Sequence, residues 1–300
     1  MINIDNLSKS FGKIQALKDV TLTIDRGKIV GVIGRNGAGK STLFKILSGL
    51  IADYEGSCTI KNQKISVKNN TFVSYMPEER GLDGRLLVKD HLVDLAMYKG
   101  IKRKKASERI DFWLNKFNLI EKKNQRVDSL SKGNQQKIQF IEVLVNQPEL
   151  LILDEPFSGL DPISTDIFWE ILLSLREQGT TIIFSSHNLS DKMNLCDEFI
   201  LIKHGQVEEN GTMDKIQNSY GYFLELINKE VPISEIKKNM AHIDVETMGN
   251  YEYKFILKDI EEAKIIQSNL GGTFTEKFFI RRPSLLEIFR IINSEENENR

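Results

Sequence analysis

A short stretch of glycines followed by a lysine and a serine is the part of this 300-residue chain best suited to chemistry. Residues 34–41 read Gly-Arg-Asn-Gly-Ala-Gly-Lys-Ser, which is the G-x-x-x-x-G-K-S spacing of a phosphate-binding loop. In such a loop backbone N–H groups surround phosphate oxygens, the lysine reaches the β- and γ-phosphates, and the serine hydroxyl ligates a bridging Mg²⁺. The alternative is a glycine-rich turn that binds nothing. The candidate ligands are Gly34, Asn36, Gly37, Ala38, Gly39, Lys40, Ser41 and Thr42, with Ser41 also the metal ligand.

Two neighbouring acids, Asp154 and Glu155, follow the apolar run Leu150–Leu153. Such a run is typical of a buried parallel strand, and open α/β sheets bind ligands at the carboxyl ends of their strands. We therefore expect Asp154 to hold Mg²⁺ and Glu155 to polarise the water that attacks a γ-phosphorus. The alternative is an acidic strand end that leads into a turn.

Three further polar positions are candidates for contact with phosphate. Ser131 and Gly133 stand at the start of a predicted helix, where a hydroxyl and free N–H groups can either cap the helix or hold an external anion. His187 follows residues 180–186, which are interpreted as a third buried strand, and is expected at the same sheet edge as Asp154. It is a candidate γ-phosphate contact there, and otherwise a turn residue.

The elements that must position these side chains follow from the hydrophobic pattern. A β-branched run at 28–33 precedes the loop, and apolar residues recur at helical spacing after it, as far as Leu50. Residues 2–25 alternate as antiparallel strands do, and 90–124 predict a small inserted helical subdomain. Phe11, in the turn between the first two strands, could stack on a nucleotide base or cap the edge of the sheet.

Composition limits the classes of protein to consider. The net charge is −1, so no overall basic field indicates a nucleic-acid partner. Cys58 and Cys196 lie far apart and outside any metal-binding spacing, which predicts reduced thiols in a cytosolic protein. No run approaches the roughly 18 apolar residues that cross a bilayer, and the first residues do not resemble a signal peptide. Any membrane role is therefore expected to depend on a partner.

Residues 1 to about 215 resemble an ABC-transporter nucleotide-binding subunit, because the motifs of that family occur here in the same order along the chain. The resemblance identifies Walker A (34–41), the signature (130–134), Walker B (Asp154, Glu155), the D-loop (158–161) and the switch histidine (His187). It implies an α/β fold, a P-loop NTPase with a RecA-like core, an antiparallel β subdomain and a helical subdomain at about 81–135. It also implies that the chain hydrolyses ATP with Mg²⁺ and that Phe11 stacks on adenine.

The resemblance further implies partners. In this family two cassettes pair head to tail, and Ser131 and Gly133 of one would close over the γ-phosphate held by Walker A of the other. A second ATP-binding subunit, expected to be a like chain in a homodimer, and a separately encoded integral membrane permease are the expected partners. The chain would then be peripheral, at the cytoplasmic face of the cell membrane. A soluble ABC ATPase acting on ribosomes or nucleic acid is the alternative, although no nucleic-acid partner is expected.

Two departures from the family pattern stand out. Residues 132–134 read Lys-Gly-Asn instead of Gly-Gly-Gln, and Glu78 replaces a glutamine that touches Mg²⁺. The Glu78 carboxylate can still be a metal ligand, but its extra negative charge could slow or retune hydrolysis. Residues 77–81, together with the C-terminal region, resemble a branch of exporters associated with drugs, peptide antibiotics or sodium. The pattern of 216–300 predicts a small α+β accessory domain for interaction or regulation.

Overall fold

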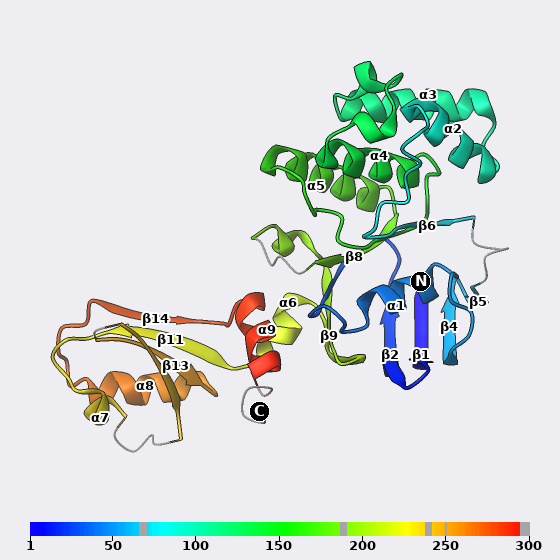
Figure 1. Cartoon of the computed structure of the whole chain (residues 1–300). Helices are drawn as coiled ribbons and strands as arrows, with labels where there is room; N and C mark the ends of the chain where they lie inside the picture. Colours follow the sequence, from blue (N-terminus) through cyan, green and yellow to red (C-terminus); the bar gives the residue numbers. More distant parts are fainter. Residues whose placement is uncertain (66–70, 187–190, 238–241, 250, 295–300) are drawn as a thin grey trace. The chain divides into compact units, whose positions relative to one another are not determined.

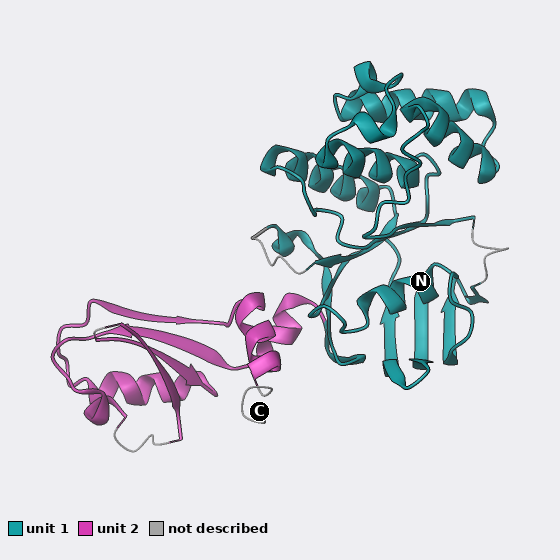
Figure 2. Cartoon of the chain, viewed as in Figure 1, with its two compact units in different colours: residues 1–210 teal, residues 211–300 magenta. Residues whose placement is uncertain are grey.

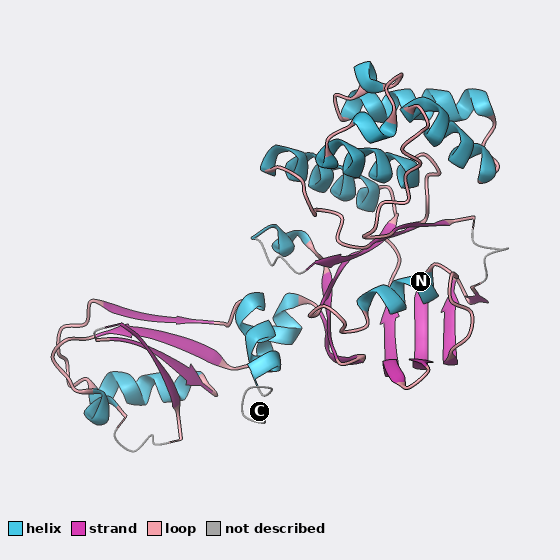
Figure 3. Cartoon of the chain, viewed as in Figure 1, coloured by secondary structure: helices cyan, strands magenta, loops and turns pink. Residues whose placement is uncertain are grey.

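The chain forms two compact units, residues 1–210 and residues 211–300 (Figure 2). The computed structural model describes residues 1–65, 71–186, 191–237, 242–249 and 251–294 (Figure 1). Both units mix helices and strands (Figure 3). No helix within these described ranges has the length and apolar character that crossing a bilayer requires.

A six-stranded sheet forms the centre of the first unit, in the order β10-β9-β3-β8-β7-β6. Its strands are β3 (Ile29–Ile33), β6 (Val73–Met76), β7 (Leu150–Leu153), β8 (Thr181–Ser186), β9 (Glu198–Lys203) and β10 (Gln206–Gly211). Every residue of β3, β7 and β8 is buried, which explains why the apolar residues of these strands are consecutive rather than alternating. Because β3, β8 and β7 pair in parallel, their carboxyl ends meet at one edge of the sheet.

A smaller antiparallel sheet, in the order β2-β1-β4-β5, shares a hydrophobic core with the central sheet. Its strands are β1 (Ile2–Phe11), β2 (Ile14–Ile24), β4 (Glu55–Ile60) and β5 (Gln63–Lys64). Helix α1 (Lys40–Leu47) contributes Leu43 and Phe44 to this core. The prediction that the helix continues as far as Leu50 is wrong, because α1 ends before Gly49, which has φ +78°, and Leu50 is 62% exposed.

Aromatic side chains pack between two of the other helices and the central sheet. The helices are α2 (Val88–Tyr98), α3 (Arg103–Lys116), α4 (Lys132–Leu144) and α5 (Pro162–Glu177), with short 3-10 turns at Ile120–Lys122, Val127–Ser129 and Asp191–Leu195. Phe140 of α4 stacks on Phe168 of α5, with ring centroids 4.2 Å apart. Trp169 of α5 meets Phe184 of β8 edge to face. These contacts tie α4 and α5 to the sheet.

The second unit is a four-stranded antiparallel sheet, in the order β12-β13-β11-β14, with its own core. Its elements are α6 (Met213–Asn218), β11 (Tyr222–Ile227), α7 (Ile233–Ile236), β12 (Asp244–Gly249), β13 (Glu252–Leu257), α8 (Ile260–Asn269), β14 (Lys277–Arg281) and α9 (Leu285–Ser294). Alternate residues such as Leu224, Leu226 and Phe255 pack against Ile266 of α8. The sequence pattern leaves 216–227 as helical or mixed, and the structure divides it between the end of α6 and strand β11.

Candidate active site

The phosphate-loop residues connect β3 to α1, as the spacing predicts. Gly37 and Gly39 adopt left-handed backbone conformations, with φ +82° and +108°. A Cβ atom on Gly39 would lie only 2.6 Å from the carbonyl oxygen of Ala16, so glycine is required there by space as well as by conformation. The leading N–H groups of α1 start at this point and have no acceptor within the helix. The loop therefore offers the donor groups that a phosphate needs.

Lys40 lies inside the loop rather than reaching into solvent. Its side chain is 7% exposed, and Nζ donates to the carbonyl oxygens of Gly34 at 2.7 Å and Arg35 at 3.2 Å. Both acceptors are neutral. A buried ammonium gains most from a nearby opposite charge, so this loop fits the phosphates of a nucleotide.

Asp154 and Glu155 are buried at the carboxyl end of β7, with 2% and 7% exposure. Ser185 of β8 connects them, because its hydroxyl donates to Asp154 Oδ1 at 2.6 Å and accepts from the Glu155 N–H at 2.9 Å. Glu155 has φ +48°, a conformation that costs a non-glycine residue about 1–2 kcal/mol and turns the chain sharply between the two acids. Backbone strain of this kind gathers at functional sites.

No sequence motif identifies Ser185 as a functional residue. It is fully buried, and it holds one acid and the backbone of the next. The available signal is the pair of hydroxyl residues Ser185 and Ser186, which ends the strand directly after the apolar residues 182–184. Only the pairing of β8 with β7 shows that the first of them faces the two acids.

Tyr75 of β6 is a second neighbour of Asp154 that sequence analysis did not select. Burial raises the pKa of the Tyr75 phenol, and the charge of Asp154, a hydrogen bond to it and the charge of Glu78 raise it further. The structure thus brings Glu78 and Asp154 into the same electrostatic neighbourhood. The Glu78 side chain is itself exposed, so it is accessible to a metal ion held near Asp154.

Ser131 and Gly133 lie at the amino end of α4. Ser131 is the N-cap, and its hydroxyl accepts from the Asn134 N–H at 3.4 Å, so the capping alternative describes its contact within the chain. Ser131 is also exposed, which leaves it accessible to an external anion. A Cβ on Gly133 would lie 3.3 Å from the carbonyl oxygen of Gly159, so the signature and the D-loop segment are adjacent.

Phe11 is 49% exposed at the end of the β1–β2 hairpin, with the ammonium of Lys9 5.0 Å from its ring centroid. Its ring is accessible for stacking, and it also ends the sheet, so both interpretations remain. His187 lies outside the described residues.

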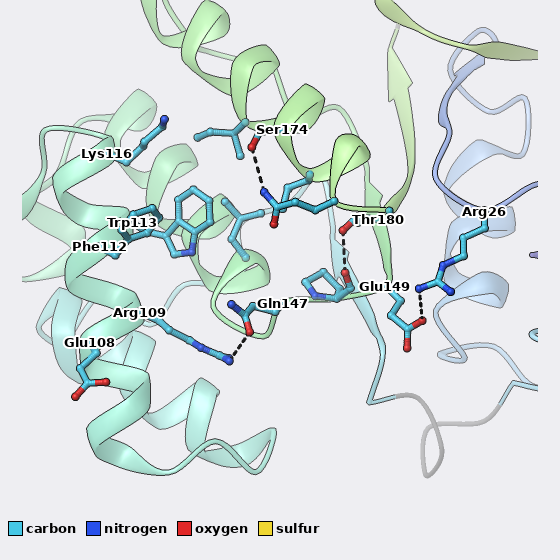
Figure 4. Close-up of a pocket in the computed structure, with 16 residues that line it drawn as sticks. Arg26, Glu108, Arg109, Phe112, Trp113, Lys116, Gln147, Glu149, Ser174 and Thr180 are labelled. Atoms are coloured by element: carbon cyan, nitrogen blue, oxygen red, sulfur yellow. Dashed lines mark hydrogen bonds and ion pairs between the residues drawn. The ribbon is translucent and has the colours of Figure 1, made fainter.

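A separate cavity of about 640 Å³ lies between α3, α5 and the residues leading into β7 (Figure 4). It lies beside Glu149 and Thr180, at the amino ends of β7 and β8, and so at the opposite end of these strands from Asp154. Trp113, half-buried, lines it. This cavity is therefore not part of the candidate active site.

Comparison with known proteins identifies the family. The sequence profile described as ABC transporter matches residues 17–158. The chain is 36% identical to the ABC transporter ATP-binding protein YhaQ of Bacillus subtilis (strain 168), over 96% of this chain and 97% of that protein. The chain belongs to the ABC transporter ATP-binding subunits. The predicted enzyme class, an ATPase, and the predicted ATP and Mg²⁺ are thereby confirmed.

Two further similar proteins match different shares of this ABC subunit. A Nod factor export ATP-binding protein I of Rhizobium sp. (strain N33) is 28% identical over 99% of this chain and 98% of its own length. A dimeric ATP-binding cassette in a post-hydrolysis state, bound to ADP and Pi, is 25% identical with a TM-score of 0.65, covering 71% of this chain and 99% of that one. The predicted α/β P-loop NTPase fold is confirmed.

Proposed function

We propose that this ABC subunit hydrolyses ATP to power a separately encoded membrane permease in the export direction. It would work as a homodimer bound peripherally at the cytoplasmic face of the cell membrane. Export is supported by the full-length similarity to a Nod factor export protein. Pairing of two like chains is supported by the dimeric cassette. The observation that carries the proposal is the pair of buried acids, Asp154 and Glu155, held at one sheet edge by Ser185.

We assign the roles as follows. Backbone N–H groups of residues 34–42 and the ammonium of Lys40 bind the triphosphate, while Phe11 stacks on adenine. Ser41, Glu78 and Asp154 would hold Mg²⁺, which neutralises charge on the β- and γ-phosphate oxygens when bound. Glu155 takes a proton from the attacking water, whose oxygen bonds to the γ-phosphorus as the bond to the ADP oxygen breaks. We assign a γ-phosphate contact to His187. The C-terminal domain, residues 216–300, is assigned a role in interaction or regulation.

Signature residues Ser131 and Gly133 would act on the nucleotide of the other chain. The exposed position of Ser131 at the start of α4 supports this division. Ser131→Ala is expected to reduce hydrolysis strongly while the monomer keeps most of its affinity for ATP, as measured by phosphate release and by titration with a fluorescent ATP analogue. Equal loss of binding and hydrolysis would make the serine only a helix cap.

Co-purification tests the membrane partner. A tagged Glu155→Gln chain with Mg-ATP, isolated from a detergent extract, is expected to retain a polytopic membrane protein. Recovery of ribosomes or nucleic acid instead would favour the soluble alternative. Deleting the subunit should raise cellular accumulation of the transported compound, and lowered accumulation would reverse the assigned direction.

A further inference from the structure

The segment that carries Glu78 is held by two buried glutamines of α4. Gln139 is 2% exposed, and its Nε2 donates to the carbonyl oxygen of Pro77 at 2.8 Å. Gln136 is 1% exposed, and its Oε1 accepts from Arg80 Nε at 3.2 Å. The two glutamines are three residues apart, so they lie on one face of the helix. Residues 77–80 are thus fastened at both ends to the helix that begins at the signature.

Gln136 also makes a bond in another direction. Its Nε2 donates to the carbonyl oxygen of Pro156 at 3.1 Å, in a buried position immediately after Glu155. An amide side chain both donates and accepts, so a single glutamine joins the two segments. A carboxylate in its place would lack the donor, and an apolar side chain would lack both groups.

The D-loop segment reaches the same point. A Cβ atom on Gly159 would lie 3.6 Å from a terminal nitrogen of Arg80, and one on Gly133 would lie 3.3 Å from the carbonyl oxygen of Gly159. The signature, the segment 77–80, the end of β7 and the D-loop therefore converge around the Arg80–Gln136 pair. Each of them carries or adjoins a residue assigned to the ATP sites.

A purely structural role would also account for two buried amides that donate to neighbouring segments. The positions of the hydrogen-bond partners of Gln136 indicate a functional role as well. Pro156 follows Glu155 directly, and Arg80 is two residues from Glu78. A displacement of about 1 Å at a reacting group can cost roughly 100-fold in rate. The contacts of Gln136 therefore bear on hydrolysis more directly than a packing contact elsewhere would.

We propose that Gln136, together with Arg80, is a positioning residue that couples the signature end of α4 to Glu78 and Glu155 of the same chain. The proposal rests on the proposed function, in which Ser131 and Gly133 serve the ATP of the other chain. It follows that binding at one ATP site alters the geometry of the other through Gln136. Hydrolysis by the dimer is then cooperative in ATP concentration, and the cooperativity depends on this amide.

Steady-state hydrolysis by the full chain over a range of Mg-ATP concentrations tests the proposal. Gln136→Met is expected to lower kcat about 10- to 100-fold, to change KM for ATP less than about 3-fold, and to bring the Hill coefficient toward about 1. Gln136→Glu, which keeps the acceptor for Arg80, should fall between this variant and the parent. A double-mutant cycle with Arg80→Met should be clearly non-additive, because the two residues act as a pair.

Gln147→Met is the matched control. Gln147 also accepts a hydrogen bond from an arginine, Arg109, but it lines the remote cavity (Figure 4), so its kinetics should equal those of the parent. If Gln136→Met does not fold by circular dichroism, Arg80→Met carries the same kinetic test. Parental kcat and Hill coefficient in a folded Gln136 or Arg80 variant, or additivity in the cycle, would overturn the proposal.

The failure of this proposal can be told apart from the failure of the proposed function. If the parent hydrolyses ATP and Glu155→Gln forms an ATP-dependent dimer while Gln136 variants match the parent, only the coupling is wrong. If the parent has no ATP-dependent dimer, the shared site is wrong and the coupling is rejected with it.

Discussion

Charged side chains at the candidate active site and on the sheet of the second unit have different kinds of partner. In the first unit, the buried Lys40 donates to backbone carbonyls and the buried Asp154 accepts from a serine hydroxyl. In the second unit, charged side chains form ion pairs with one another on the sheet face opposite the core. Glu287 accepts from Arg281 at 2.7 and 2.8 Å and lies 3.3 Å from Lys254, while Glu225 pairs with Lys277 and Arg281.

This difference in partners distinguishes charges that can bind a ligand from charges that stabilise the fold. A buried charge with neutral neighbours has unused capacity for an oppositely charged ligand. A charge that is already ion-paired contributes to the stability of the fold instead. Truncating one partner of such a pair is destabilising, because it leaves the other charge buried without compensation. Substitutions of the active-site charges should therefore alter ATP binding or turnover with little change in stability, and substitutions of the paired charges in the second unit should do the reverse. Four measurements test this contrast.

Glu155→Gln should have the largest effect. Removing the base is expected to lower turnover about 1,000-fold, within the range for general-base catalysis, with a thermal midpoint close to that of the parent. Phosphate release measures the rate, and light scattering with Mg-ATP should give twice the 34.4 kDa mass of one chain. Glu170→Gln, an exposed acid on α5, is the control. Hydrolysis at the parental rate would remove Glu155 from its assigned role.

Lys40→Ala should weaken ATP binding about 100-fold, because a hydrogen bond to a charged group contributes about 1.5–3 kcal/mol. Calorimetric titration with an ATP analogue measures the affinity. Lys45→Ala on the exposed face of the same helix serves as the comparison. Equal affinities for the two variants would mean that the buried ammonium does not face phosphate.

Glu287→Gln should affect the second unit only. Glu287 and Ser284 form a reciprocal cap at the start of α9, in which each accepts from the backbone N–H of the other. We expect a loss of about 2 kcal/mol, seen as amide exchange about 30-fold faster in peptides covering 222–257 and 277–294. ATP turnover should stay within about twofold of the parent. Exchange that speeds up equally in residues 1–210 would erase the contrast between the units.

This contribution should also depend on pH. Although burial opposes it, hydrogen bonds from Arg281 and Ser284 lower the pKa of Glu287 to about 2. The ordinary value in the unfolded chain is 4.5, so the stabilisation is fully present above that pH and is lost as pH falls toward about 2. The stability difference between the parent and Glu287→Gln should shrink over this window. Glu246→Gln, an exposed partner of Lys254, should show a smaller difference throughout.

Ser185→Ala should give the smallest of the four effects. Losing the hydroxyl that holds Asp154 and the Glu155 N–H is expected to lower kcat about 10-fold, as for other groups that orient metal ligands. KM for ATP should change less, and Ser174→Ala on α5 is the control. A purely structural serine would lower the thermal midpoint without lowering kcat.

Local sequence patterns predicted much of the fold and of the candidate site. The loop 34–41 and the buried strands β3, β7 and β8 could be read from residue spacing, because each depends on neighbours along the chain. The end of α1 before Leu50 and the strand β11 within 216–227 could not. Gly49 needs tertiary context to show whether it interrupts or ends a helix, and a short apolar run is ambiguous between helix and strand until its partners are known.

The phosphate loop, the acid pair after β7 and the family they indicate follow from the amino-acid sequence, since they consist of fixed residue types at fixed spacing. Tertiary structure alone decided that Ser185 holds the two acids, that Gln136 joins Arg80 to Pro156, and that Glu287 is matched by Arg281. The physical reason is that a hydrogen bond depends on distance in space. Strand pairing and helix packing bring together residues such as Arg80 and Gln136, 56 positions apart in the chain.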